Sequence, residues 1–321
     1  MKPSSGQTAL ARALSPVRAR MVVQHRPVDR DLLVVGHVNV DRILSVRAFP
    51  DRDRTVPVLA SRIQLGGTAS NIARVAASYG VRTSLWSRLG DGFPVDFWNR
   101  LHADGIDLSM TERIRGAPTP ACYIVEDSHH GQRTFIEQGV MGAEAARAKV
   151  PASAIARHTW MHLTTGEPDW YLRIASAARA AHVRISFDPA QEIHYRWDRR
   201  RLRALLGQSE ILFGNVSEIE RARRMLGLSR VERLTELVPL VIRTEGRKGA
   251  SAFSRAGRVH VAAARPHRRA TLVGAGDAFR GGFYTAWFAG ADLGRCVGAG
   301  TRAAARWIEG SWADGSHRRP A

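Results

Sequence analysis

Short apolar runs separated by helix-like patterns recur along most of the chain. The first run, Asp31-Leu-Leu-Val-Val-Gly36, is continuous and ends in glycine, which predicts a strand buried on both faces. Further strands are predicted, with helices between them, at 83–86, 159–164, 183–187, 210–214, 239–243 and 250–254. Strand–helix alternation at this spacing predicts an α/β fold with a mostly parallel, doubly wound sheet.

Two stretches interrupt this rhythm. Residues 42–64 alternate loosely between apolar and polar positions, with breaks at Pro50 and Pro57, and residues 113–137 form a second β-rich patch. We expect the two stretches to pack together as a small separate sheet, and we place both within one domain at 31–314. Helices are predicted at about 69–79, 275–290 and 293–308.

The charge balance is strongly basic, with 48 Lys and Arg against 29 Asp and Glu and a formal net charge of +19. Such a charge favours nucleic-acid binding, but only three of the 48 are lysines and no motif of interleaved basic and aromatic residues accompanies them. Arginine bias spread over a metabolic enzyme explains the excess better, and a nucleic-acid partner is not expected.

The two ends differ from the middle of the chain. Residues 1–28 contain no Asp or Glu, so we expect 1–30 to be a basic, disordered leader and 315–321 to be a short basic tail. The leader is also compatible with an organelle transit segment, or with a start at Met21. Two cysteines and no apolar run of about 20 residues favour a cytoplasmic protein with no membrane segment.

A glycine-rich loop before the helix at 275–290 carries the clearest chemistry. The backbone amides of Gly274, Ala275 and Gly276 can converge on an oxyanion or a transferring phosphoryl group at the helix amino terminus. Asp277, in the first turn, can then take a proton from an attacking hydroxyl. The alternative is an Asp that caps the helix.

Polar side chains near two other glycine-rich turns suit a hydroxyl-bearing ligand. Gly66 and Gly67 permit close approach of the backbone, and Asn71 follows one turn into a helix. Asn39 and Asp41 share one face at the end of the first strand. A plain strand-to-helix turn and a solvated strand end are the alternatives.

Two later loops suit a nucleotide. Asn215 and Glu218 lie three residues apart at a helix start, where they could hold a hydrated Mg²⁺ near phosphates or simply cap the helix. Thr244, Gly246 and Gly249 belong to a turn after a buried strand.

The order and spacing of these loops resemble those of the ribokinase-like (PfkB) carbohydrate kinase family. The first family signature is met by Gly66, Gly67, Ala69, Asn71, Ala73, Gly80 and Gly90, and the second by residues 274–277. The resemblance implies a ribokinase-like fold with a β-sheet lid from 42–64 and 113–137. It further implies transfer of the γ-phosphoryl group of ATP to a sugar-type hydroxyl.

The resemblance also assigns roles to the residues quoted above. Asp277 matches the catalytic base, and Gly274, Ala275 and Gly276 match the anion hole. The substrate set matches Asn39, Asp41, Gly66, Gly67 and Asn71. The residues that match the family's ATP-binding positions are Asn215, Thr244, Gly246 and Gly249. Glu218 and Asn215 match the residues that contact Mg²⁺ through water. Pairing of two subunits through the lid is a further implication.

Residues 165–168, 187–191 and 277–283 look most similar to the nucleoside kinase branch of the family, which implies a purine nucleoside as acceptor. A ribokinase- or fructokinase-type sugar kinase is the alternative. One departure from the family pattern is Thr271, followed by Leu272, where an acidic residue usually helps to bind a monovalent cation. This puts activation by K⁺ in doubt and leaves a catalytically weakened family member with a binding or regulatory role as a further alternative.

Overall fold

The computed structural model describes residues 30–129, 131–268 and 272–310. The leader, the tail and Thr271 lie outside these residues. Most of the described strands belong to one eight-stranded sheet, and the others form two smaller sheets. The strands are β1 Arg30–Val35, β2 Asn39–Val46, β3 Val58–Gly66, β4 Thr83–Trp86, β5 Arg88–Asp91, β6 Glu112–Pro118, β7 Ala121–Glu126, β8 Gln132–Glu137, β9 His158–Leu163, β10 Arg184–Phe187, β11 Ile211–Asn215, β12 Leu240–Thr244, β13 Ala250–Ser254 and β14 Gly257–Val261.

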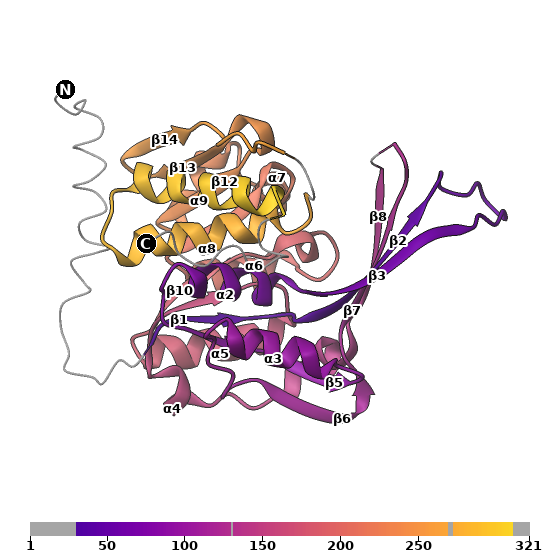
Figure 1. Cartoon of the computed structure of the whole chain (residues 1–321). Coiled ribbons are helices and arrows are strands. Elements are labelled where there is room, and N and C mark those ends of the chain that lie inside the picture. The colour runs from indigo at the N-terminus through magenta and orange to yellow at the C-terminus, as the bar shows by residue number, and fades with distance from the viewer. Residues whose placement is uncertain (1–29, 130, 269–271, 311–321) are drawn as a thin grey trace.

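Helices flank the large sheet on both faces (Figure 1). The α-helices are α2 Thr68–Ser78, α3 Val95–Ala103, α4 Ala152–Ile155, α5 Pro168–Ala180, α6 Arg199–Leu206, α7 Val216–Met225, α8 Ala275–Phe288 and α9 Leu293–Ile308. The 3-10 helices are η1 Gly139–Met141, η2 Ala143–Arg147, η3 Ala190–His194, η4 Val231–Glu236 and η5 Gly246–Lys248.

The large sheet has the strand order β14-β13-β12-β11-β10-β9-β1-β4. The six strands from β4 to β12 run parallel, and β13 and β14 are antiparallel additions at one edge. The predicted α/β architecture is therefore confirmed. The sequence pattern missed β14, whose side chains are exposed or half-buried at the sheet edge and so lack a long apolar run.

The continuous apolar run of β1 follows from burial on both faces of the sheet. Leu32 and Val34 pack into the core formed with α2, α3, α8 and α9. Leu33 and Val35 pack into the core on the opposite face, with α5, α6 and α7. The parallel strands thus end at one edge of a sheet that is covered on both sides, which is where ligands bind in open α/β folds.

The small sheet has the order β3-β2-β7-β8 and extends away from the body of the molecule (Figure 1). It confirms that the two β-rich stretches pair with each other. The stretch 113–118 is a correction, because β6 pairs with β5 in a separate two-stranded sheet. Gly90 permits this pairing, since a Cβ there would lie 2.2 Å from the carbonyl oxygen of Ala117.

Candidate functional site

The two glycine-rich loops meet at the amino-terminal ends of α2 and α8. Nδ2 of Asn71 donates a hydrogen bond of 2.9 Å to Oδ2 of Asp277, across 206 residues of sequence. The helices approach closely because Gly281 lies against Val75, where an added Cβ would come within 2.6 Å of the valine. Two signature segments that are distant in the sequence therefore build one polar site.

Asp277 is positioned by the start of α8 rather than used to cap it. Gly274 is the residue before the helix and has a φ of 83°, and no side chain of the described residues caps α8. A Cβ at Gly274 would also lie 2.7 Å from the indole of Trp307, so both conformation and packing favour glycine here. The capping alternative for Asp277 does not hold in this structure.

The predicted anion-hole residues begin α8. The amide of Ala275 donates to the carbonyl oxygen of Leu272 at 3.3 Å, and the carbonyl of Gly274 accepts from Ala278 at 2.9 Å. Gly274, Ala275 and Gly276 thus lie at the positive end of the helix dipole, beside the Asp277 carboxylate.

Asp41 lies on β2 at the base of the small sheet and is 5% exposed. Burial and the nearby charge of Asp277 raise the pKa of Asp41 to about 7, against a hydrogen bond from Gln64 that lowers it. The two carboxyl groups therefore share one partly dehydrated site.

Two buried oxygen atoms of the predicted substrate set have no hydrogen-bond partner among the described residues. They are Oδ1 of Asn39 and Oδ1 of Asp41. A buried polar atom without a partner is costly, and a ligand hydroxyl would satisfy it. Both residues are at the β2 end nearest the large sheet, so they fit a hydroxyl-bearing acceptor.

Gly66 and Gly67 make room for this arrangement. A Cβ on Gly66 would lie 2.0 Å from Oδ2 of Asp41. Gly67 has a φ of 97°, and a Cβ there would lie 2.4 Å from the carbonyl oxygen of His37. The paired glycines are therefore explained by close approach of the neighbouring chain segments.

Burial is also the largest influence on Asp277. It raises the pKa of Asp277 to about 7, and the charges of Asp188 and Glu218 add to that increase. Arg280 and the hydrogen bond from Asn71 act in the opposite direction. A carboxyl group with a pKa near neutral pH is suited to accept a proton from a hydroxyl.

Asn215 and Glu218 form a capping box at the start of α7. The Asn215 side chain accepts from the Glu218 amide at 3.0 Å, and Oε2 of Glu218 accepts from the Asn215 amide at 2.7 Å. Oε1 of Glu218 accepts from Gln191 at 2.9 Å, and burial raises the pKa of Glu218. These two side chains therefore cap the helix, as the alternative interpretation expected. Because their oxygen atoms already accept hydrogen bonds within the protein, a contact with Mg²⁺ would have to be made through water.

Thr244 lies beside Asn215, because the two residues pair at the carboxyl ends of β12 and β11. Gly246 has a φ of 58° and faces open space. Gly249 has a φ of 104°, and a Cβ there would lie 2.0 Å from the carbonyl oxygen of Val261. The residues predicted to bind the nucleotide thus share the sheet edge that carries the rest of the candidate site.

The sequence reasoning missed two charged residues of the site. Asp188 follows β10 and forms a buried ion pair with Arg280 of α8. An acid after an apolar strand and an arginine inside an otherwise apolar helix are the signals that could have indicated them.

The sequence pattern also gave no sign of a polar cluster where the small sheet joins the body of the molecule. Oε1 of Gln138 lies 2.7 Å from Nε2 of His37 and accepts from Arg196 at 2.8 Å. Glu192, 1% exposed, accepts from the amide of Gly166 at 2.6 Å and from Gln138 at 3.3 Å. Gln138 directly follows β8, so its contacts connect the base of the small sheet to the loop after β1 and to η3.

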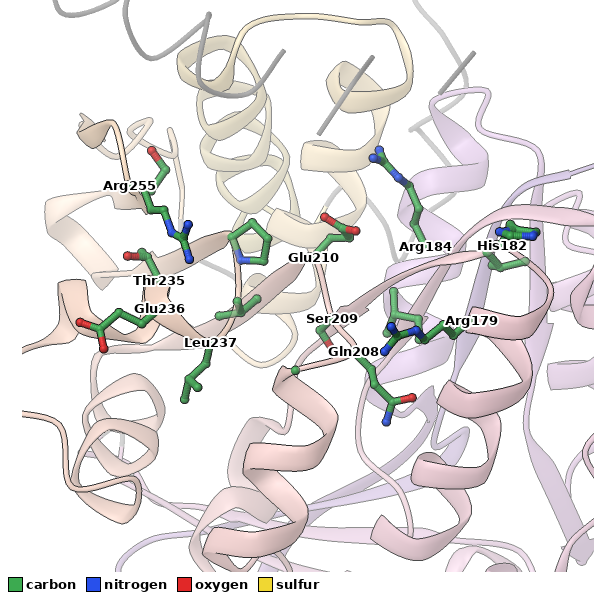
Figure 2. Close-up of a pocket in the computed structure, with 16 residues that line it drawn as sticks. Arg179, His182, Arg184, Gln208, Ser209, Glu210, Thr235, Glu236, Leu237 and Arg255 are labelled. Atoms are coloured by element: carbon green, nitrogen blue, oxygen red, sulfur yellow. The ribbon is translucent and has the colours of Figure 1, made fainter. Parts of the chain in front are cut away.

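A pocket with a volume of about 620 Å³ lies at the other edge of the large sheet, and Figure 2 shows the residues that line it. It is lined at the amino-terminal ends of β10, β11 and β12, near Arg184, Ser209 and Pro239. The site residues follow the carboxyl ends of the same strands, so this pocket is separate from them.

Residues 30–129, 131–268 and 272–310 contain no group of three or more His, Cys, Asp or Glu residues placed to hold a metal ion. No helix within that part of the chain is long and apolar enough to cross a membrane.

The sequence profile of the pfkB family of carbohydrate kinases matches residues 29–314. The chain belongs to this family. As a pfkB member it is a phosphotransferase that uses ATP and acts on a nucleoside or a sugar.

Nucleoside kinases are among the most similar relatives of this pfkB protein. The nucleoside kinase of Methanothermobacter thermautotrophicus is 35% identical over 274 residues, which cover 84% of this chain and 86% of the relative. The crystal structure of the Methanocaldococcus jannaschii nucleoside kinase aligns with a TM-score of 0.78 at 27% identity, covering 87% and 92% of the two chains. The Burkholderia thailandensis nucleoside kinase in complex with inosine has a TM-score of 0.78 at 22% identity, covering 86% and 91%, and supports the fold.

Proposed function

We propose that this pfkB protein transfers the γ-phosphoryl group of ATP to the 5′-hydroxyl of a purine nucleoside, with Asp277 as the general base. The observation that carries the proposal is the hydrogen bond between Asn71 and Asp277, with Asp41 beside them. It joins the acceptor-binding loop to a carboxyl group at the start of α8. The nucleoside kinase relatives favour a nucleoside over a free sugar.

The acceptor side is proposed to consist of Asn39, Asp41, Gly66, Gly67 and Asn71. The unpartnered oxygens of Asn39 and Asp41 accept hydrogen bonds from sugar hydroxyls, which removes the cost of leaving those atoms buried and unpaired. Asn71 holds the Asp277 carboxylate in place through Oδ2.

The nucleotide side is proposed to consist of Asn215, Thr244, Gly246 and Gly249, with Glu218 and Asn215 facing Mg²⁺ through water. Bound Mg·ATP supplies the phosphoryl group and neutralises part of its charge. Among the described residues, the carboxyl groups of Asp188, Glu218 and Asp277 all act on the guanidinium of Arg280, so acidic groups exceed this one cation there. The negative excess favours a nucleotide that arrives with its cation.

In the transfer step Asp277 takes the proton of the acceptor hydroxyl as its oxygen bonds to the γ-phosphorus. The bond from that phosphorus to the bridging oxygen breaks, and ADP leaves with the electron pair. The amides of Gly274 and Gly276, at the positive end of α8, stabilise the equatorial oxygens, and the Ala275 amide joins them once it releases the carbonyl oxygen of Leu272. Asp277 then releases its proton to solvent.

The small sheet is proposed to act as a lid that excludes water from the transfer, and to pair two subunits. Its outer surface exposes Leu59, Ile63 and Phe135, which supports a partner on that side. Light scattering after size exclusion would give twice the monomer mass if this pairing occurs.

A phosphotransfer screen tests the substrate assignment. Adenosine, guanosine, inosine, cytidine, ribose and fructose are each offered with Mg·ATP, and ADP release and phosphorylated product are measured. Purine nucleosides are expected to give the highest kcat/KM, and 5′-deoxyadenosine, which lacks the acceptor hydroxyl, is expected to give no product. Turnover confined to ribose or fructose would replace the nucleoside assignment by the sugar kinase alternative.

A further inference from the structure

Arg280 lies one turn after Asp277 on α8 and is only 4% exposed. Its neighbours in sequence, Phe279 and Gly281, are apolar or small, and a buried arginine in such a position is retained only if its charge is paired. Its guanidinium also lies 5.9 Å from the ring centroid of Phe213, so water has little access to that side. The position of Arg280 therefore calls for a specific partner.

The guanidinium bridges two segments of the site. Its Nε forms a buried ion pair with Oδ2 of Asp188, at the carboxyl end of β10. Its Nη1 donates a hydrogen bond of 2.8 Å to the carbonyl oxygen of Gly276. A Cβ on Gly276 would lie 2.8 Å from Nη1, so the glycine leaves room for the guanidinium.

Three carboxyl groups act on Arg280 from different elements of the fold. Asp188 follows β10, Glu218 belongs to α7, and Asp277 shares α8 with the arginine. The buried His162 of β9 also interacts with it, and burial, with the charge of Arg280, holds the pKa of that imidazole well below its usual value. Among the described residues, Arg280 is a cation that these three carboxyl groups share.

We propose that Arg280 is a positioning residue for phosphoryl transfer, which holds the first turn of α8 against the end of β10 and so fixes Asp277 and the amides of residues 274–276. The proposal rests on the proposed function only for the role of Asp277 and of the α8 amino terminus. A displacement of reacting groups by about 1 Å can lower the rate about 100-fold, so the contacts of Arg280 with Asp188 and Gly276 are expected to matter for turnover.

Steady-state kinetics of Arg280→Gln and Arg280→Lys test the role, with whichever acceptor the wild-type protein uses best. Arg280→Gln is expected to lower kcat about 100-fold and Arg280→Lys about 10-fold, because lysine keeps the charge but cannot reproduce the two-pronged contact. The KM values for ATP and acceptor should stay within about threefold of wild type. Arg295→Gln is the matched control, because Arg295 lies on α9 with a highly exposed side chain and pairs with Asp292 at the surface.

The pH profile separates positioning from a merely structural role. Arg280 lowers the pKa of Asp277, so its neutralisation should move the acidic limb of kcat/KM to higher pH in Arg280→Gln but not in Arg280→Lys. The other groups that face Asp277 are Asn71, Asp41, Asp188 and Glu218, and they are the same in both variants.

Asp188→Asn provides a second route if Arg280→Gln does not fold. It removes the ion pair while keeping the arginine, and kcat should fall about 10-fold. Folded variants whose kcat stays within threefold of wild type, or whose only change is a higher KM, would overturn the proposal. A wild-type protein that phosphorylates sugars but no nucleoside would instead refute the substrate assignment alone.

Discussion

Replacing Asp277 by Asn removes proton acceptance while keeping most of the local geometry. The amide oxygen of Asn can still accept from Nδ2 of Asn71, which lies 2.9 Å from Oδ2 of Asp277. What is lost is general-base catalysis, which contributes about 10²- to 10⁴-fold. We expect kcat to fall about 10³-fold, equivalent to about 4 kcal/mol of barrier.

The pH dependence of the wild-type enzyme follows from the same carboxyl group. Burial raises the pKa of Asp277 to about 7, and the base acts only when it is deprotonated. Activity should therefore rise with pH through about 7, and at pH 5 only about 1% of the base would be ionised, which gives about a 100-fold lower kcat/KM than at high pH. Asp41 also has a pKa of about 7 and interacts with Asp277. The apparent pKa of the acidic limb of the pH–activity profile therefore belongs to the two carboxyl groups together.

The assay couples ADP release to a saturating indicator enzyme and measures kcat at several pH values, while ATP binding is measured by thermal shift. Asp277→Asn should bind ATP within about threefold of wild type, because the groups that position the nucleotide remain. Asp96→Asn is the matched control, since Asp96 also lies in the first turn of a helix but is exposed. A folded Asp277→Asn enzyme with more than a tenth of wild-type turnover would refute the reasoning. An apparent pKa below 5 for the acidic limb of the wild-type pH–activity profile would refute it as well.

Two further variants and one exchange of cation have expected outcomes. Gly66→Ala should raise the KM for the acceptor at least tenfold in steady-state kinetics and leave the KM for ATP unchanged, because the added Cβ would lie 2.0 Å from Asp41. Gly207→Ala is the control, since a Cβ at Gly207 would have no neighbouring atom closer than 3.5 Å. Asp41→Asn should stabilise the protein by up to about 4 kcal/mol above pH 7, as measured by urea unfolding. The pKa of Asp41 is about 7 in the folded protein and 3.8 in the unfolded chain, so the wild type loses stability as pH rises between those values. If the stability of Asp41→Asn relative to wild type did not increase over this pH range, the raised pKa of Asp41 would be contradicted. Turnover should change less than twofold when Na⁺ replaces K⁺, because Thr271 stands where the family usually has an acid, and a strong K⁺ requirement would show that another residue supplies the cation site.

The element pattern could be predicted where burial is simple. The strand at 250–254 and the helix at 293–308 have the predicted bounds. For the helix the reason is the periodic spacing of its buried residues, which marks one buried face. The pairing of 113–118 could not be predicted, because its exposed and half-buried positions do not distinguish the small sheet from a partner at β5.

The glycines show a similar division. Their spacing in the sequence marked the loops at Gly66 and Gly274 as unusual, and the resemblance to the pfkB family assigned them to ligand binding. The structure adds a packing reason for each, since Gly66 makes room for Asp41 and Gly274 makes room for Trp307. These neighbours are far away in sequence, so no local pattern could identify them.

The sequence by itself determined the alternation of strands and helices, the family, and the candidate base at Asp277, because periodicity and motif spacing are local properties of the chain. Only the tertiary structure decided which charges surround that base. Asn71 lies on α2, Asp188 in the loop after β10 and Arg280 on α8. Their approach in the folded protein holds Asp277 and sets its pKa. Electrostatic interactions depend on distance and burial, and neither quantity exists until the chain has folded.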